Sequence, residues 1–236
     1  MKSFALIWCS RAVDARLQTA LLNAFRGEQQ EWDVISPAED DFLERARLYD
    51  GYVISGSPRS VVDDADKPFV KNLLTLIEDV QAHSSAPMIG VCFGAQAIAA
   101  ALGGHVGRNP DGRFKLGAET LDWLPQAEPS RWPELADTAV LAQSHGECIS
   151  RLPPGSELLA ASPSAVAEIF LVQRRFLGIQ GHPELDNLLL RQAFLPLHRR
   201  QFDDEAWLKV EHEAQQPLHP EPVTALGRRL LIEGSL

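Results

Sequence analysis

Cys92 lies in the sequence Gly-Val-Cys-Phe-Gly at residues 90–94, which has the Gly-x-Cys-x-Gly spacing of a nucleophile elbow. The apolar residues before it predict a buried strand, and the alanine-rich run after it predicts a short helix that ends at residues 103–104. Glycines on both sides relieve the clashes that a Cβ atom would cause in so sharp a turn. We therefore expect Cys92 at a helix N-terminus, where unpaired N–H groups and the helix dipole favour a thiolate nucleophile. The alternative is a small buried cysteine that packs as a hydrophobic residue.

His182 and Glu184 follow an apolar run that predicts another strand. Side chains two positions apart in extended chain leave the same side, and Pro183 excludes a helix between them. A cysteine nucleophile needs a base, and the base needs an orienting group. Glu184 can hold one imidazole nitrogen while the other faces Cys92. The alternative for an isolated histidine is a surface position, which we expect for these four: His83, His198, His212 and His219.

Acyl transfer also requires N–H groups that stabilise an oxyanion. The N–H of Phe93 comes from the elbow itself, and residues 55–58 end another predicted strand. Pro58 has no N–H, so Gly56 and Ser57 must supply the second donor. The alternative is an ordinary turn. A phosphate-binding loop is excluded because no Gly-Lys-Ser/Thr follows and no Gly-x-Gly-x-x-Gly occurs.

The elements that must position these groups form an α/β pattern. Strands alternate with helical segments up to Gly104, which predicts a doubly wound, mostly parallel sheet. The predicted strands are residues 4–8, 32–35, 52–54 and 88–91. Later apolar runs predict antiparallel strands added to this sheet: residues 116–124, 139–142, 157–161, 166–172 and 176–179.

The chain after Glu184 is helical in pattern, with a break at Pro196 and a last helix at residues 225–232. We expect a catalytic domain at residues 1–184 and a helical C-terminal extension, residues 185–236, packed on it.

Composition excludes several classes of protein. A chain of 236 residues with 45% hydrophobic residues can build a core without staples, and its net charge of −10 argues against a nucleic-acid surface. No apolar run approaches the ~20 residues of a membrane span, so we expect no membrane partner. Three cysteines form no disulfide framework, which favours a cytoplasmic location. His145 and Cys148 have the spacing of half a metal site, but no second pair exists, so we expect no metal.

These motifs together resemble the class I, or triad, glutamine amidotransferase family, and most closely stand-alone proteins similar to the glutaminase half of GMP synthase. The likeness covers about residues 3–184 and includes, besides the segments above, these matches: residues 55–61, 102–104, 143–147 and 152–155. Three positions depart from the commonest pattern: Ser57 replaces a glycine, Ala95 a histidine and Gly181 an aromatic residue. We expect Gly181 to leave extra room beside His182.

The resemblance implies a flavodoxin-like fold and a cofactor-free reaction. Cys92 would attack the side-chain amide of glutamine and release ammonia, and water activated by His182 would hydrolyse the glutamyl thioester. Phe93 and Ser57 would be the oxyanion donors. The substrate-binding residues would be Gly56, Gln96 and a turn formed by Ser144, His145, Gly146 and Glu147. His145 is an alternative base, although its segment is better interpreted as one that holds substrate.

Several functions stay open from the sequence. The first is a hydrolase of γ-glutamyl amide bonds that gives glutamate and ammonia, with or without a synthetase partner that accepts the ammonia. The second is a hydrolase of γ-glutamyl peptides or conjugates, which Gly181 and the missing ATP-binding module favour slightly. A DJ-1/PfpI-type cysteine protein and a non-catalytic binding module are further alternatives.

Overall fold

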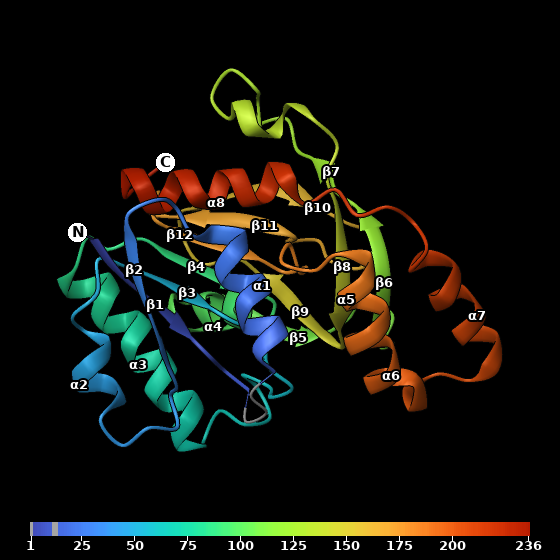
Figure 1. Ribbon diagram of the computed structural model, residues 1–236, viewed down its shortest axis with the longest axis horizontal. Helices are drawn as coiled ribbons and strands as arrows, with labels where there is room; N and C mark the ends of the chain where they lie inside the picture. Colours follow the sequence, from blue (N-terminus) through green and yellow to red (C-terminus); the bar gives the residue numbers. More distant parts are fainter. Residues whose placement is uncertain (1, 11–13) are drawn as a thin grey trace.

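The computed structural model describes residues 2–10 and 14–236 (Figure 1). An eight-stranded sheet forms its centre, with the strands in this order: β2 (Gln30–Ile35), β1 (Lys2–Ile7), β3 (Gly51–Ile54), β4 (Met88–Val91), β12 (Phe176–Ile179), β11 (Ile169–Val172), β10 (Ser156–Ala161) and β7 (Asp122–Trp123). The first five strands in this order, β2, β1, β3, β4 and β12, are parallel to one another. The last three strands, β11, β10 and β7, continue the sheet with antiparallel pairings. The predicted α/β fold is therefore confirmed.

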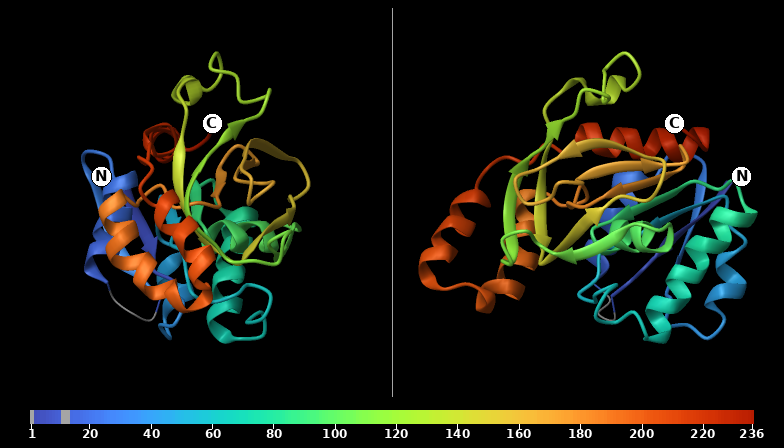
Figure 2. Two further views of the ribbon diagram at one scale, coloured as in Figure 1. Left: turned by 90° about the vertical axis from the view of Figure 1, so that its right-hand side faces the viewer. Right: turned by 180° about the vertical axis from the view of Figure 1, so that it is seen from behind.

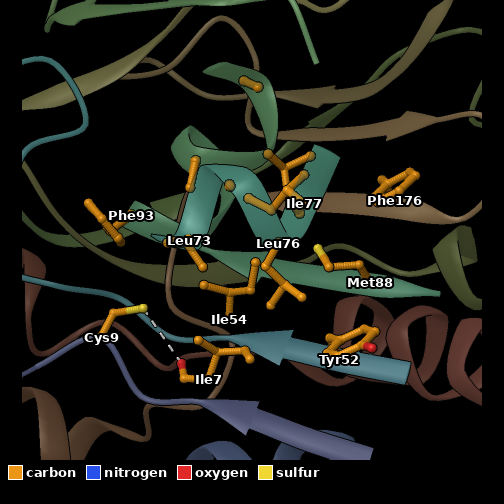
Figure 3. Packing of buried hydrophobic residues seen from close by; sticks show 14 of the residues in the cluster. Ile7, Cys9, Tyr52, Ile54, Leu73, Leu76, Ile77, Met88, Phe93 and Phe176 are labelled. Atoms are coloured by element: carbon orange, nitrogen blue, oxygen red, sulfur yellow. Dashed lines mark hydrogen bonds between the residues drawn. The ribbon is translucent and has the colours of Figure 1, made fainter. Parts of the chain in front are cut away.

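Helices cover both faces of this sheet. Successive side chains along each strand point to opposite faces, so both faces carry apolar residues that must be buried. In β1, Ala5 and Ile7 belong to one buried cluster, part of which Figure 3 shows, whereas Phe4 and Leu6 belong to another. The helices that share the first cluster are α2 (Phe42–Ala46), α3 (Pro68–His83) and α4 (Phe93–Ala101), and those that share the second are α1 (Ala15–Phe25) and α8 (Glu221–Glu233). Both faces of the parallel core are thus buried, as strands that are apolar on both sides require.

Two smaller antiparallel sheets lie beside the main one: β5 (His105–Arg108) with β9 (Glu147–Arg151), and β6 (Lys115–Thr120) with β8 (Val140–His145). The single strand expected at residues 116–124 is therefore wrong. The chain changes partner at Leu121, because β6 pairs with β8 whereas β7 pairs with β10. The polar residues of β5 and β9 hide both strands from a search for apolar runs. A short 3₁₀ helix, η1 (Pro133–Ala136), lies between β7 and β8.

The chain beyond residue 184 forms consecutive helical segments: α5 (Asn187–Leu189), the π-helical turn η2 (Leu190–Phe194), α6 (Leu195–His198), the 3₁₀ helix η3 (Arg199–Gln201), α7 (Asp204–Glu213) and α8. The expected break at Pro196 is wrong, because Pro196 lies in the first turn of α6, where a missing N–H is tolerated. Side chains of α8 share a core cluster with the central sheet, and the domain division at residue 184 stays a prediction. No helix in the described ranges is long and apolar enough to cross a membrane.

Candidate active site

Cys92 connects β4 to α4 in a strained turn, with φ +50° and ψ −106°. A Cβ atom on Gly90 would lie 2.4 Å from the carbonyl carbon of Gly94, and one on Gly94 would lie 2.5 Å from the carbonyl oxygen of Ile54. Only glycine fits both positions, so these two residues allow the turn to form. The thiol is buried, with 6% of Cys92 exposed, and lies at the N-terminus of α4.

His182 and Glu184 follow β12, the parallel neighbour of β4. The N–H of His182 donates to the carbonyl oxygen of Ala142 at 2.8 Å, and its Nδ1 lies 2.8 Å from Glu184 Oε1. Burial lowers the pKa of His182, but the charges of Glu184 and Cys92 outweigh this and raise it well above its usual value. Nε2 is buried and has no hydrogen-bond partner among the described residues. It is therefore the ring nitrogen that is free for chemistry.

Gly56, just beyond β3, shows that the thiol and the imidazole face the same space. A Cβ atom on Gly56 would lie 3.0 Å from His182 Cε1 and 3.8 Å from Cys92 Cβ. The carboxyl ends of the neighbouring strands β3, β4 and β12 thus bring these three residues together. Residues that are far apart in the chain become neighbours because parallel strands end at one edge of the sheet.

The two predicted oxyanion donors flank this space. Phe93 is the first residue of α4, so its N–H has no partner within the helix. The side chain of Ser57 is used locally: its hydroxyl donates to the carbonyl oxygen of Cys9 at 2.7 Å and accepts from the N–H of Arg59 at 3.1 Å. The serine that replaces a glycine thus anchors the loop to the end of β1. The donor roles stay a prediction.

A buried glutamine, Gln180, lies against the thiol, and a second buried glutamine, Gln96, lies next to Gln180. Gln96 Nε2 donates to the carbonyl oxygen of Glu147 at 2.8 Å and lies 3.4 Å from Gln180 Oε1, while Gln180 Nε2 lies 3.9 Å from Cys92 Sγ. Gln96 therefore holds the backbone of β9, and its contact with substrate stays a prediction. Sequence reasoning missed Gln180. The one feature of the sequence that could have indicated Gln180 is its position directly after an apolar strand and two residues before His182.

The turn expected at residues 144–147 is wrong. Ser144 and His145 end β8, Glu147 begins β9, and only Gly146 lies between the two strands. The chain therefore passes from one strand to the next, and β8 pairs with β6 whereas β9 pairs with β5. The carbonyl oxygen of Ser144 nevertheless lies 3.8 Å from Cys92 Sγ. The segment therefore reaches the candidate site as strand ends rather than as a turn.

The side chains of His145 and Glu147 are engaged within the protein. His145 Nδ1 lies 2.9 Å from Asn109 Oδ1, and burial lowers the pKa of this histidine to about 4, which keeps the ring neutral. The Glu147 carboxylate accepts from Ser60 Oγ at 2.8 Å and pairs with Arg108 at 3.1 Å. His145 is thus poorly suited as the base. No group of three histidine, cysteine or acidic residues in the described part of the chain could hold a metal ion.

The extra room expected beside Gly181 does not exist. A Cβ atom there would lie 2.8 Å from both Gln143 Nε2 and Glu168 Oε1, which already fill the space. Glu168 is fully buried and accepts from the Gly181 N–H at 2.8 Å, from Gln143 Nε2 at 2.8 Å and from Ser162 Oγ at 3.0 Å. Burial raises the pKa of Glu168 to about 7. Sequence reasoning missed this residue, although a glutamate directly before an apolar strand was visible.

The C-terminal segment supplies an aromatic neighbour of the imidazole. The Phe194 ring meets His182 edge-on, with centroids 5.0 Å apart and planes at 64°. His198, expected at the surface, is instead half-buried, and its ring lies 4.6 Å from that of Phe114. Burial and the charge of His182 lower the pKa of His198. No local pattern places these residues at the site.

The chain is similar in sequence and fold to known proteins. The family model described as "Glutamine amidotransferase class-I" matches residues 12–196. "Gamma-glutamyl peptidase 3" of Arabidopsis thaliana is 30% identical over 207 residues, which cover 83% of this chain and 81% of the peptidase. "GMP synthase [glutamine-hydrolyzing]" of Mycolicibacterium paratuberculosis is 35% identical over 148 residues, which cover 60% of this chain and 25% of the synthase. A solved glutamine amido transferase from Methylobacillus flagellatus shares the fold, with a TM-score of 0.72 and 23% identity over 100% of this chain and 96% of that one.

Proposed function

From the premise that this chain belongs to the class I glutamine amidotransferase family, we propose that it hydrolyses γ-glutamyl amide bonds with Cys92 as nucleophile, His182 as acid and base, and Glu184 as the orienting group. The observation that carries the proposal is the meeting of thiol and imidazole at Gly56. The family assignment replaces the DJ-1/PfpI-type alternative.

In the first half-reaction the Cys92 thiolate attacks the carbonyl carbon of the amide, and a C–S bond forms. The carbonyl oxygen becomes an oxyanion that accepts from the N–H groups of Phe93 and Ser57, each worth about 2.7–4 kcal/mol in the transition state. The C–N bond then breaks while His182 Nε2 transfers its proton to the departing nitrogen. The products of this step are a free amine or ammonia and a glutamyl thioester.

In the second half-reaction the neutral His182 takes a proton from water at Nε2. The resulting hydroxide attacks the thioester carbon, the C–S bond breaks, and the thiolate of Cys92 leaves. Glutamate is released, and the imidazolium–thiolate pair is restored. Glu184 holds Nδ1 throughout, so Nε2 alone carries the moving proton.

We infer that the physiological substrate is a γ-glutamyl peptide or conjugate. The likeness to the Arabidopsis thaliana peptidase spans more of this chain than the likeness to the GMP synthase, and it spans most of the peptidase itself. The second candidate is a glutaminase that supplies ammonia to a synthetase partner. It is supported by the match to the GMP synthase, whose name describes a glutamine-hydrolysing enzyme.

A turnover screen tests both proposals. The purified protein is assayed with glutamine and with γ-glutamyl dipeptides, beside Cys92→Ala and the matched control Cys148→Ala, which changes another buried cysteine. We expect turnover to disappear only in Cys92→Ala, and a glutamine-analogue electrophile to label Cys92. Activity that survives in Cys92→Ala would overturn the nucleophile. A protein that neither turns over nor labels would be a non-catalytic binding module.

A further inference from the structure

The C-terminal segment lies against the candidate active site. Figures 1 and 2 show α5, α6 and α7 on the β6–β8 side of the molecule, away from α2 and α3. The π-helical turn η2 ends at Phe194 and brings that ring edge-on to His182 at 5.0 Å between centroids. One flank of the proposed base is therefore formed by a residue outside the strands that carry the triad.

Phe194 belongs to a row of rings that we call the aromatic wall, formed by Phe194, His198 and Phe114. Centroid distances along it are 6.4 Å from Phe194 to His198 and 4.6 Å from His198 to Phe114. At its far end, a Cβ atom on Gly146 would lie 3.3 Å from Phe114 Cδ2. The wall thus extends from the imidazole to the link between β8 and β9, along the edge of the candidate site.

Two members of the aromatic wall, Phe194 and Phe114, pack against a buried apolar cluster, and Phe114 also meets Phe202 edge-on with centroids 6.2 Å apart. Burial and the charge of His182 lower the pKa of His198, which favours its neutral ring. Directly after Phe114 in the chain, Lys115 of β6 lies with its Nζ 2.8 Å from Glu213 of α7. Gly117, with φ +132°, leaves room for Glu213, because a Cβ atom there would lie 2.6 Å from its Oε2. These contacts hold the three rings together beside His182, and two of them are apolar phenyl rings.

The proposed reaction places the leaving group of the substrate next to the aromatic wall. His182 Nε2 must come within about 3 Å of the leaving nitrogen to protonate it. Whatever that nitrogen carries is then beside His182 and within reach of the Phe194 ring. Ammonia, the leaving group of glutamine, has no carbon atoms to contact a ring. The amine released from a γ-glutamyl peptide carries a side chain.

We propose that the aromatic wall is the leaving-group subsite, and that it selects γ-glutamyl amides of amines with aromatic or bulky apolar side chains over glutamine. This rests on the proposed function and deepens it, because it names the class of amine that departs. Phe194 is its central specificity-determining residue. The contact is an apolar one, so its loss affects binding of the larger substrates more than the chemical step.

The experiment compares kcat and KM for glutamine, γ-glutamylglycine and γ-glutamylphenylalanine in wild type, Phe194→Ala and Leu197→Ala. Leu197 is the matched control, since it lies on α6, which directly follows η2, and is 71% exposed. We expect wild type to prefer γ-glutamylphenylalanine. Phe194→Ala should reduce the ratio of kcat/KM for γ-glutamylphenylalanine to that for glutamine by about tenfold, which is about 1.4 kcal/mol, mainly through KM. Leu197→Ala should leave the ratio unchanged.

Each outcome decides the proposal. An equal loss for all three substrates would mean that Phe194 only supports His182, and an unchanged ratio or a wild-type preference for glutamine would also overturn the subsite. If Phe194→Ala does not fold, Phe194→Leu, which keeps part of the apolar bulk, should shift the ratio in the same direction by a smaller factor. Absence of wild-type turnover together with unlabelled Cys92 would instead reject the underlying function. The two failures are therefore distinguishable.

Discussion

His182 Nδ1 lies 2.8 Å from Glu184 Oε1, with both side chains buried and a single proline between them in the chain. A carboxylate at this distance fixes the orientation of the imidazole and stabilises its protonated form. It also leaves Nε2 as the nitrogen without a partner among the described residues. The pair is thus built to present one defined nitrogen to the space it shares with Cys92.

Glu184→Gln should reduce kcat by about 10²-fold or more, because the imidazolium loses the carboxylate that stabilises it. The charge of Glu184 helps raise the pKa of His182, so its removal lowers that pKa. The alkaline limb of the kcat profile, where His182 loses its proton, should therefore move to lower pH. The pKa of His182 is raised to about 10, so kinetics from about pH 6 to about pH 11 are needed to follow the limb in both proteins. Glu205→Gln on the exposed face of α7 is the control, and an unmoved limb would contradict the prediction.

Gly56→Ala should impair catalysis while leaving the fold largely intact. The new Cβ atom would lie 3.0 Å from His182 Cε1, so the imidazole must shift by a few tenths of an ångström. Small displacements of a catalytic group are costly, and we expect a loss in kcat of about tenfold to 10²-fold. Gly107→Ala is the control, since a Cβ atom there meets nothing closer than 3.8 Å. Equal activity of the two variants would show that Gly56 does not position the imidazole.

Glu168→Gln should flatten the pH dependence of stability between about pH 4.5 and 7. The buried carboxyl has its pKa raised to about 7, so in this window the folded state binds more protons than the unfolded state. The contribution of Glu168 to the free energy of unfolding is therefore fully present below the pKa of the unfolded state, and it is lost as the pH rises through about 7. Glutamine can keep the acceptor for Gly181 and donate to Ser162 without titrating. Urea unfolding of both proteins at several pH values measures the difference. Parallel curves would rule out Glu168 as the titrating group.

Gly181→Ala should destabilise the protein by about 1–3 kcal/mol, the usual cost of overpacking a buried site. Its Cβ atom would lie 2.8 Å from both Gln143 Nε2 and Glu168 Oε1 and must displace one of them. Denaturant unfolding checks the loss, with Gly107→Ala again as the control. Unchanged stability would mean that the space beside Gly181 is open after all.

Much of the fold was accessible from sequence patterns because their causes are local. Continuous apolar runs revealed the parallel strands, which need apolar residues on both faces. Strands such as β5 and β9 escaped because polar residues, including the buried Glu147, interrupt their apolar runs. The length of β6 was misjudged for a different reason. Its end at Thr120 is decided by which strand it pairs with, and pairing is not encoded within the segment.

The sequence by itself determined the sharp turn at Cys92 and the side-by-side placement of His182 and Glu184, since steric crowding at Gly90 and Gly94 and the alternation of extended chain act over a few residues. Only the tertiary structure decided that Glu168 fills the space beside Gly181 and that Phe194 covers the imidazole. Those contacts join segments that are remote along the chain. Such contacts depend on how the strands and helices pack against one another, and that packing cannot be inferred from any short stretch of residues alone.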